Sequence, residues 1–562
     1  MHLLQTFTPT SDPLGAQWLS ALVALLPILT MLVTLGALRW KAHHAAGISW
    51  LVALLVGVLA FKMPIAMALA TSVQGFVYGL FPIVFILLSA IWMYQVTVIS
   101  GRFDDLRRTF FLISDDPRIL GILIAFCFGG LLEALAGFGA PVAIAAAMLI
   151  AVGFGKLRAA LTALVANTVP VAFGAVGLPV LMAAKAGEVP VQMVAEVTAR
   201  VCAMLCLVVP FLLLWIMDGK KGVKECWPFG LFVGIVFGIT KVIVAATPVF
   251  NLTEVFCAVI SVALAMVFLK VWQPKGGHEA AGRIGIPMDP SVETEPIKAQ
   301  ATGAEGLTAA RIWMSLVPYI LVIVVFSIAA LPAVKSLLAS ADQKIAWPLL
   351  GGLNSVTGQP AGHRSYTLPL LSQPGFLLVL VALMVGLVYR VPMKEVFAEL
   401  GRNAAKMKFS ALTIGLVVAL AYVMGDSGQT LALGLFVAGA GALYPFLAPI
   451  LGWIGTYVTG SDTSANLLFS NLQSSVGTQI GTGSHLGTET MRGLLVGTGG
   501  AGGVVGKMIS PQSLTIAATA IGLAGGESVI LRNIFKYSIV LLVMMCILAG
   551  LMSTPVLSWL VP

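Results

Sequence analysis

The chain has 562 residues, of which 59% are hydrophobic and only 10% are charged, and its formal net charge at pH 7 is +9. A soluble protein would need roughly 25% charged residues to cover its surface, so the composition excludes a soluble fold of this length. Apolar runs of about 20 residues recur along the chain, which predicts an all-α polytopic membrane protein and argues against a transmembrane β-barrel, whose strands alternate. The positive charge then indicates basic cytoplasmic loops rather than nucleic-acid binding.

Hydropathy predicts membrane-embedded segments along the whole chain. The first of them follows no basic stretch and is long enough to span, so no cleavable signal peptide is expected. Some segments are half-helices or re-entrant pieces, so we expect about 12 to 14 transmembrane helices. In chain order, the predicted segments cover residues 18–38, 47–61, 76–99, 119–135, 138–155, 159–183, 192–217, 228–248, 252–271, 312–332, 375–389, 408–424, 430–450, 452–480, 491–526 and 538–560.

Lysine and arginine are divided unequally between alternate loops. We place the N-terminus outside and let 119–155 form a re-entrant hairpin that returns to its own side. Of the 32 basic residues, 23 then fall in inside loops and 6 in outside loops, Lys185 and Lys241 among the latter. This bias predicts that both termini are periplasmic. It also favours the hairpin, because a single crossing at 119–155 would move later basic loops to the wrong side.

Two membrane halves are predicted, residues 1–272 and 311–562. The segment between them, 273–310, is polar and contains glycines and prolines, which is typical of a flexible linker, here cytoplasmic. Each half holds a glycine-rich break with an acid, and then a polar break that ends near a proline. These breaks lie near 133–141 and 165–170 in the first half, and near 455–470 and 499–513 in the second. The pattern predicts two inverted repeats with broken helices.

Two carboxylates interrupt otherwise apolar sequence at the glycine-rich breaks. Glu133 lies in GLLEALAGFGAP and Asp462 in TGSDTSAN. An acid at membrane depth costs a few kcal/mol and mostly persists where it handles ions or substrate. We therefore predict Glu133 as the proton carrier, with Asp462 second. The alternatives are a structural hydrogen bond for Glu133 and a helix N-cap role for Asp462.

An anionic substrate inside the membrane needs hydrogen-bond donors, which the free N–H groups at helix N-termini provide. Each of three strings predicts the start of a half-helix: GFGAP (137–141), GSDTS (460–464) and SPQS (510–513). In these strings glycine permits the turn, serine caps the helix, and proline suits the first helical turn. Lys507 offers a counter-charge, or else snorkels to the interface. The alternative for the breaks is a kink that serves helix packing. The predicted substrate-binding residues are Gly137, Gly139, Asn167, Ser461, Thr463, Ser464, Asn466, Lys507, Ser510 and Gln512.

No cofactor or metal is expected beyond protons as the coupling ion. The six cysteines lie mostly in apolar segments without metal-ligand or disulfide spacing, so packing roles are expected. The predicted spans hold no paired histidines or catalytic cluster, which argues against a membrane-embedded enzyme.

Four strings resemble the bacterial lactate/glycolate permease family: CFGGLLEALAGFGAPVAI (127–144), VANTVPVAFG (165–174), TGSDTSAN (459–466) and GKMISPQS (506–513). The resemblance runs nearly end to end. It implies a proton-coupled symporter that imports L-lactate, D-lactate or glycolate across the bacterial inner membrane. It also implies kinship with transporters that often form homodimers. The residues themselves leave open a sodium-coupled or dicarboxylate transporter of a related fold, or a passive organic-anion channel.

Overall fold

The computed structural model describes residues 6–34, 38, 40–110, 112–135, 139–289, 307–354, 361–523 and 526–562. These residues are mostly helical, which confirms the predicted all-α membrane protein. The first part of the chain forms α1 (Gln17–Leu32), α2 (Ala42–Leu59), α3 (Ile65–Tyr78), α4 (Phe85–Ile99), α5 (Arg102–Phe110), α6 (Pro117–Ile122), α7 (Gly129–Leu135), α8 (Ala140–Val152), α9 (Lys156–Ala166), α10 (Gly174–Ala186), α11 (Val191–Ala245), α12 (Thr253–Val271) and α13 (Gly277–Ile284).

The second part of the chain adds further helices and one small sheet. Its elements are α14 (Ala309–Ala330), α15 (Pro332–Ala339), β1 (Gln343–Ala346), β2 (Ser365–Leu368), α16 (Pro374–Val388), α17 (Met393–Ser427), α18 (Gln429–Ala438), α19 (Tyr444–Thr459), α20 (Asp462–Gly481), α21 (Thr488–Lys507), α22 (Pro511–Ala520) and α23 (Glu527–Met552).

Nine helical stretches of the described residues are long and apolar enough to cross a membrane, or up to ten if the bent pair α9–α10 forms one span. One of the nine, α11, turns back on itself at Asp218–Gly219, where Gly219 has φ +61°. Beyond this turn Gly234 packs against the backbone of Cys206, so the 55 residues of α11 form a hairpin of two arms, as predicted for 192–217 and 228–248. The total of about 12 to 14 crossings and the inverted repeats stay predictions.

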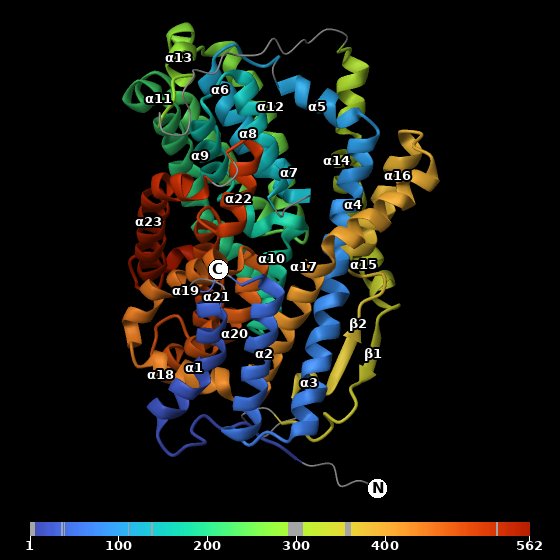
Figure 1. Ribbon diagram of the computed structural model, residues 1–562, viewed down its shortest axis with the longest axis vertical. Coiled ribbons are helices and arrows are strands. Elements are labelled where there is room, and N and C mark those ends of the chain that lie inside the picture. The colour runs from blue at the N-terminus through green and yellow to red at the C-terminus, as the bar shows by residue number, and fades with distance from the viewer. Residues whose placement is uncertain are drawn as a thin grey trace.

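Figure 1 shows α5, α6, α11 and α13 at one end of the molecule and the β1–β2 sheet at the other. At the first end, buried Arg118 pairs with Asp116 at 2.8 Å and with Asp218 at 3.2 Å. Arg283 of α13 also binds Asp218, at 2.7 Å. The predicted flexibility of 273–310 is therefore wrong for 277–284, because ion pairs and buried apolar side chains hold this segment as a packed helix. Residues 290–306 of the linker lie outside the described residues.

At the opposite end, β1 and β2 pair antiparallel, with Gln343 opposite Leu368. The sequence predicted no strand here. Tyr366 donates a hydrogen bond to the carbonyl of Phe81 at 2.6 Å, which ties the sheet to the membrane helices. Trp347 does the same at the carbonyl of Ala70, at 3.0 Å.

A histidine next to β2 is expected to make stability depend on pH. His363 Nδ1 lies 2.8 Å from Asp426 Oδ1 in α17, and its ring stacks on Tyr422. Burial lowers the pKa of His363, but the neighbouring Asp426 carboxylate outweighs this and raises the pKa above its ordinary value of 6.5. A raised folded-state pKa gives stabilisation that is complete below about pH 6.5 and is lost as the pH rises through the raised value.

We therefore expect His363→Gln to lower the thermal unfolding temperature more at about pH 6 than at about pH 9, as ion pairing predicts. The measurement is the unfolding temperature of both purified proteins across this range. An equal difference at both ends would contradict a charged His363–Asp426 pair.

Candidate functional site

Glu133 is buried inside the protein and ion-paired. It lies on α7, within the stretch Pro117–Leu135, whose most apolar window is 100% buried. Its Oε1 accepts a hydrogen bond from Lys507 Nζ at 2.8 Å, while its Oε2 has no partner. Lys507 is the last residue of α21, where the free carbonyl groups of a helix favour a cation. The pair joins breaks from the two predicted halves of the chain, and the snorkelling alternative for Lys507 is wrong.

The segment around Glu133 doubles back, as expected of a re-entrant hairpin. After α7 the chain resumes at Gly139, which has φ +87° and directly precedes α8. Beyond the end of α8 the chain returns to α6, where Phe154 lies beside Gly121. Gly139 thus starts a helix as predicted, while Gly137 lies outside the described residues.

The second carboxylate, Asp462, lies at the first turn of α20. Ser461 caps this helix by accepting a hydrogen bond from the N–H of Ser464, so the alternative of Asp462 as the N-cap is wrong. Asp462 instead accepts hydrogen bonds from Thr456 Oγ1 at 3.3 Å and from Asn466 Nδ2 at 3.4 Å. Asn466 also donates to the carbonyl of Pro179 in α10, which ties α20 to the other half of the chain.

The third predicted helix start is also present. Ser510 accepts a hydrogen bond from the N–H of Ser513 and caps α22. Gln512 lies on the first turn of this helix, against Gly460, where an added methyl group would collide with it. On the other side of Lys507, Asn167 ends α9 with its Oδ1 buried and unpaired.

These elements line a small central cavity. Its lining includes five predicted residues: Glu133, Ser461, Asp462, Thr463 and Lys507. The volume is about 30 Å³, enough for about two water molecules but not for a three-carbon acid. This conformation therefore leaves little free volume beside the ion pair. The other described candidates, Gly139, Asn167, Ser464, Asn466, Ser510 and Gln512, lie outside this lining and belong to the surrounding helix ends.

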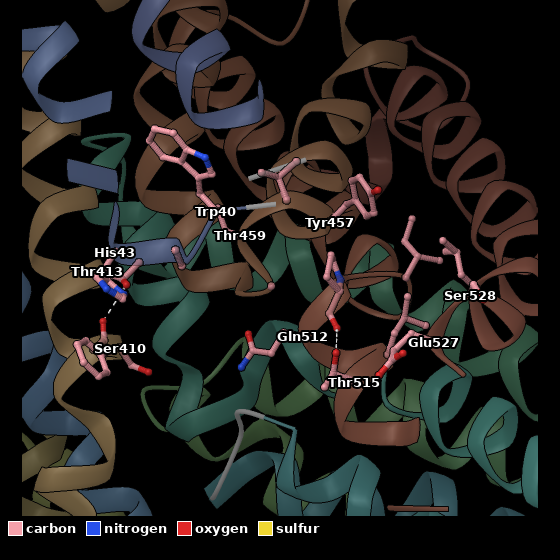
Figure 2. A pocket seen from close by; sticks show the side chains of 18 residues that line it. Trp40, His43, Ser410, Thr413, Tyr457, Thr459, Gln512, Thr515, Glu527 and Ser528 are labelled. Atoms are coloured by element: carbon pink, nitrogen blue, oxygen red, sulfur yellow. Dashed lines mark hydrogen bonds between the residues drawn. The ribbon is translucent and has the colours of Figure 1, made fainter. Parts of the chain in front are cut away.

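A much larger cavity of about 780 Å³ lies next to the central one. Gln512 stands near its middle, with His43 and Ser410 on one side and Thr515 on the other (Figure 2). Gly460 lines both cavities, whereas Gln512, which contacts Gly460, lines only the larger one.

The start of α10 is strained where it borders the central cavity. Ala175, Val176 and Gly177 have φ of 44°, 60° and 74°. A β-branched residue in this region is an outlier, and such strain costs of order 1–3 kcal/mol per residue and gathers at functional sites. The sequence reasoning missed this turn, although two glycines and a proline in Gly174–Pro179 could have signalled it.

A buried ion pair between α11 and α12 was also missed. Lys241 was predicted in an outer loop, and this is wrong, because it lies fully buried within α11 and pairs with Glu254 of α12. Lys241 also donates to the carbonyl of Val169, at 3.2 Å, in the break between α9 and α10. The rule that selected Glu133, an acid isolated in apolar sequence, would have selected Glu254 too.

Broken helices that meet around a buried ion pair, within a bundle of apolar membrane-length helices, are the architecture of a multi-pass membrane transport protein. A family model described as L-lactate permease matches residues 20–556. The chain therefore belongs to the L-lactate permease family.

Two curated relatives are matched over almost their whole length. The chain is 37% identical to the glycolate permease GlcA of Escherichia coli K12, over 95% of this chain and 96% of the relative. It is 35% identical to the L-lactate permease of Bacillus subtilis 168, over 100% of both chains. Among solved structures, the Neisseria gonorrhoeae MtrF transporter gives a TM-score of 0.46 at 12% identity, covering 87% of this chain and 84% of its own.

Proposed function

We propose that this protein is a proton-coupled symporter that imports small 2-hydroxymonocarboxylates, namely L-lactate, D-lactate and glycolate, across the bacterial inner membrane. The observation that carries the proposal is the buried Lys507–Glu133 pair at the meeting of the broken helices. The names of the relatives support the substrates, since one is a glycolate permease and another an L-lactate permease.

The ion pair suggests how proton and anion are coupled. Protonation of Glu133 removes its charge and releases Lys507 from its present partner. A substrate carboxylate then takes the place of the Glu133 carboxylate on Lys507 Nζ, with the free N–H groups at the start of α20 as further donors. Without the proton, the anion and Glu133 would compete for one cation, and the anion would add a further carboxylate to a cavity that already holds Glu133 and Asp462, at a high cost.

This exchange determines the net charge that crosses the membrane in each transport cycle. One proton with one monovalent anion carries no net charge, so the pH gradient alone drives transport, by about 1.4 kcal/mol per pH unit. A second proton would add about 2.3 kcal/mol per 100 mV of membrane potential. Uptake driven by voltage at zero pH gradient would therefore contradict a 1:1 stoichiometry.

The large cavity supports a route to one face of the membrane. Its lining includes Trp40 and Glu527, which are close in sequence to Lys41 and to the basic segment 532–536, and these are predicted to be cytoplasmic. We infer that substrate leaves through this cavity once the Gly460–Gln512 contact opens. Periplasmic termini and a homodimer are parts of the same proposal.

The test is uptake of radiolabelled L-lactate into proteoliposomes under an imposed pH gradient, with glycolate and D-lactate as competitors. We expect uphill accumulation that is unchanged when choline replaces sodium and is not inhibited by succinate. Dependence on sodium would favour a sodium-coupled transporter. Flux that never exceeds equilibrium would favour a passive organic-anion channel.

A glycine beside Asp462 allows a specific prediction. A methyl group at Gly503 of α21 would collide with Asp462 Oδ1 and lie 2.7 Å from Thr456 Oγ1. Overpacking of this kind typically costs about 1–3 kcal/mol, so we expect Gly503→Ala to slow L-lactate uptake about 10- to 100-fold. Gly401→Ala on α17, where an added methyl group meets nothing, is the matched control. Equal uptake by both variants at equal amounts in the membrane would contradict the prediction.

A further inference from the structure

A third cavity lies toward the end of the molecule that carries β2. It has a volume of about 280 Å³, and its lining comes from α3, α10, α17, α20 and the β2 strand. We call it the outer cavity, because the loops at this end are the ones predicted to be periplasmic. It is lined by Gln74, Tyr78, Lys185, Ala186, Glu188, His363, Ser365, Tyr366, Thr367, Val418, Ala421, Tyr422, Leu467 and Asn471.

The outer cavity follows the same two helices as the central cavity. Lys185 lies on α10, six residues beyond Pro179, and Asn471 lies on α20, five residues beyond Asn466. Pro179 and Asn466 are hydrogen-bonded to each other beside the central cavity. Six helical residues correspond to about 9 Å, so the two linings lie about this far apart along α10.

The wall of the outer cavity holds two buried polar atoms without partners. They are Gln74 Oε1 and Tyr78 Oη. The Gln74 side-chain nitrogen already donates to the carbonyl of His363 at 3.0 Å, so this amide is fixed with its oxygen unsatisfied. A buried polar atom left unpaired costs about 1–3 kcal/mol, and a ligand that pairs both atoms would recover this.

Among the charged side chains described at the wall, Lys185 is a cation that is available to bind an anion. Lys185 Nζ lies 5.3 Å from the centre of the Tyr78 ring and forms no ion pair with any described carboxylate. Of the two acids in or beside the cavity, Asp426 is bound by His363 and Thr71. Glu188 is exposed on the chain just after α10. A small anion in the cavity can therefore bind an unpaired ammonium group that lies over the ring whose hydroxyl has no partner.

We propose that the outer cavity is an entry site that binds a 2-hydroxymonocarboxylate before it reaches the central cavity. Lys185 and the hydroxyl of Tyr78 hold the carboxylate, and Gln74 Oε1 accepts the hydrogen bond of the substrate's hydroxyl. The site discriminates against acids without a hydroxyl group, because these leave Gln74 Oε1 unpaired. This inference rests on the proposed function for its ligand but uses none of the residues of the central cavity.

The experiment measures protection of an introduced cysteine in the full-length protein in proteoliposomes. Ser365→Cys lines the outer cavity next to Gln74, and a membrane-impermeant thiol reagent reports its accessibility. Five of the six native cysteines are buried, and labelling of half-buried Cys546 is subtracted using the parent protein. L-lactate should slow labelling of Ser365→Cys, and propionate, which lacks the hydroxyl, should do so less.

Variants identify the groups responsible. Lys185→Gln and Tyr78→Phe should each raise the lactate concentration needed for half-protection about tenfold. Tyr389→Phe, whose hydroxyl bonds Met314 elsewhere, should not. Protection should persist when Lys507→Gln disables the central site. If that variant does not insert, the parent background with Tyr78→Phe still provides the test.

The outcomes separate the two proposals. Normal lactate uptake without lactate protection at Ser365→Cys overturns the entry site and leaves the proposed function standing. Loss of both uptake and protection overturns both. Equal protection by lactate and propionate overturns the role given to Gln74.

Discussion

Glu133→Gln is expected to abolish proton-driven accumulation of L-lactate while preserving exchange of lactate across the membrane. The glutamine keeps the shape of the side chain and, like a protonated Glu133, carries no charge, so Lys507 stays free to bind the carboxylate. It cannot take up or release a proton. A gradient of one pH unit should give the wild type about tenfold accumulation and the variant none.

Two measurements test the two parts of this prediction separately. Counterflow of labelled lactate against unlabelled lactate reports exchange, and uptake under an imposed pH gradient reports coupling. Asp462→Asn serves as the comparison, since Asp462 lines the same cavity but is held by Thr456 and Asn466. Loss of both accumulation and exchange in a correctly inserted Glu133→Gln protein would reassign Glu133 to substrate binding or structure.

Lys241→Met is expected to destabilise the protein more than any other single change discussed above. It leaves Glu254 as an unpaired charge at a site where both partners are fully buried, which typically costs about 3–5 kcal/mol. It also removes the donor that satisfies the carbonyl of Val169 in the broken segment between α9 and α10. The measurement is the thermal unfolding temperature of the purified protein in detergent.

The double variant Lys241→Met, Glu254→Leu separates charge from packing. Replacing a whole buried ion pair by apolar groups is often neutral or stabilising, so the double variant should recover much of the lost stability. A double variant as unstable as Lys241→Met would mean that the hydrogen bond to Val169, rather than the lone charge, accounts for the loss.

Much of the fold was predictable because the bilayer permits few kinds of backbone structure. Apolar runs predicted the all-α class, and the predicted half-helix starts at Gly139, Ser461 and Ser510 each precede a helix. Local rules suffice there, since a capping serine or a glycine turn acts within a few residues. The β1–β2 hairpin was not predicted, because its two strands are short and 18 residues separate Ala346 from Ser365.

The site was predicted as a set of residues but not as a geometry. Sequence singled out Glu133 and Lys507 separately, and nothing in it joined two residues 374 positions apart into one ion pair. Lys241 was misplaced because charge counting treats a basic residue near the end of a span as belonging to a loop. Its partner Glu254 is only 13 residues away, yet an ion pair between two spans depends on how the helices pack.

The neutral pairing of Glu133 with Lys507 affects how the empty transporter returns to its starting conformation. If a proton and a lactate anion enter this site together, they add nothing to its overall charge, so the full and vacant forms are electrically alike. The membrane potential then favours neither stroke of the cycle. Direction is left to the chemical gradients of acid and proton, and the same molecule would release lactate from a cell that produces it in excess.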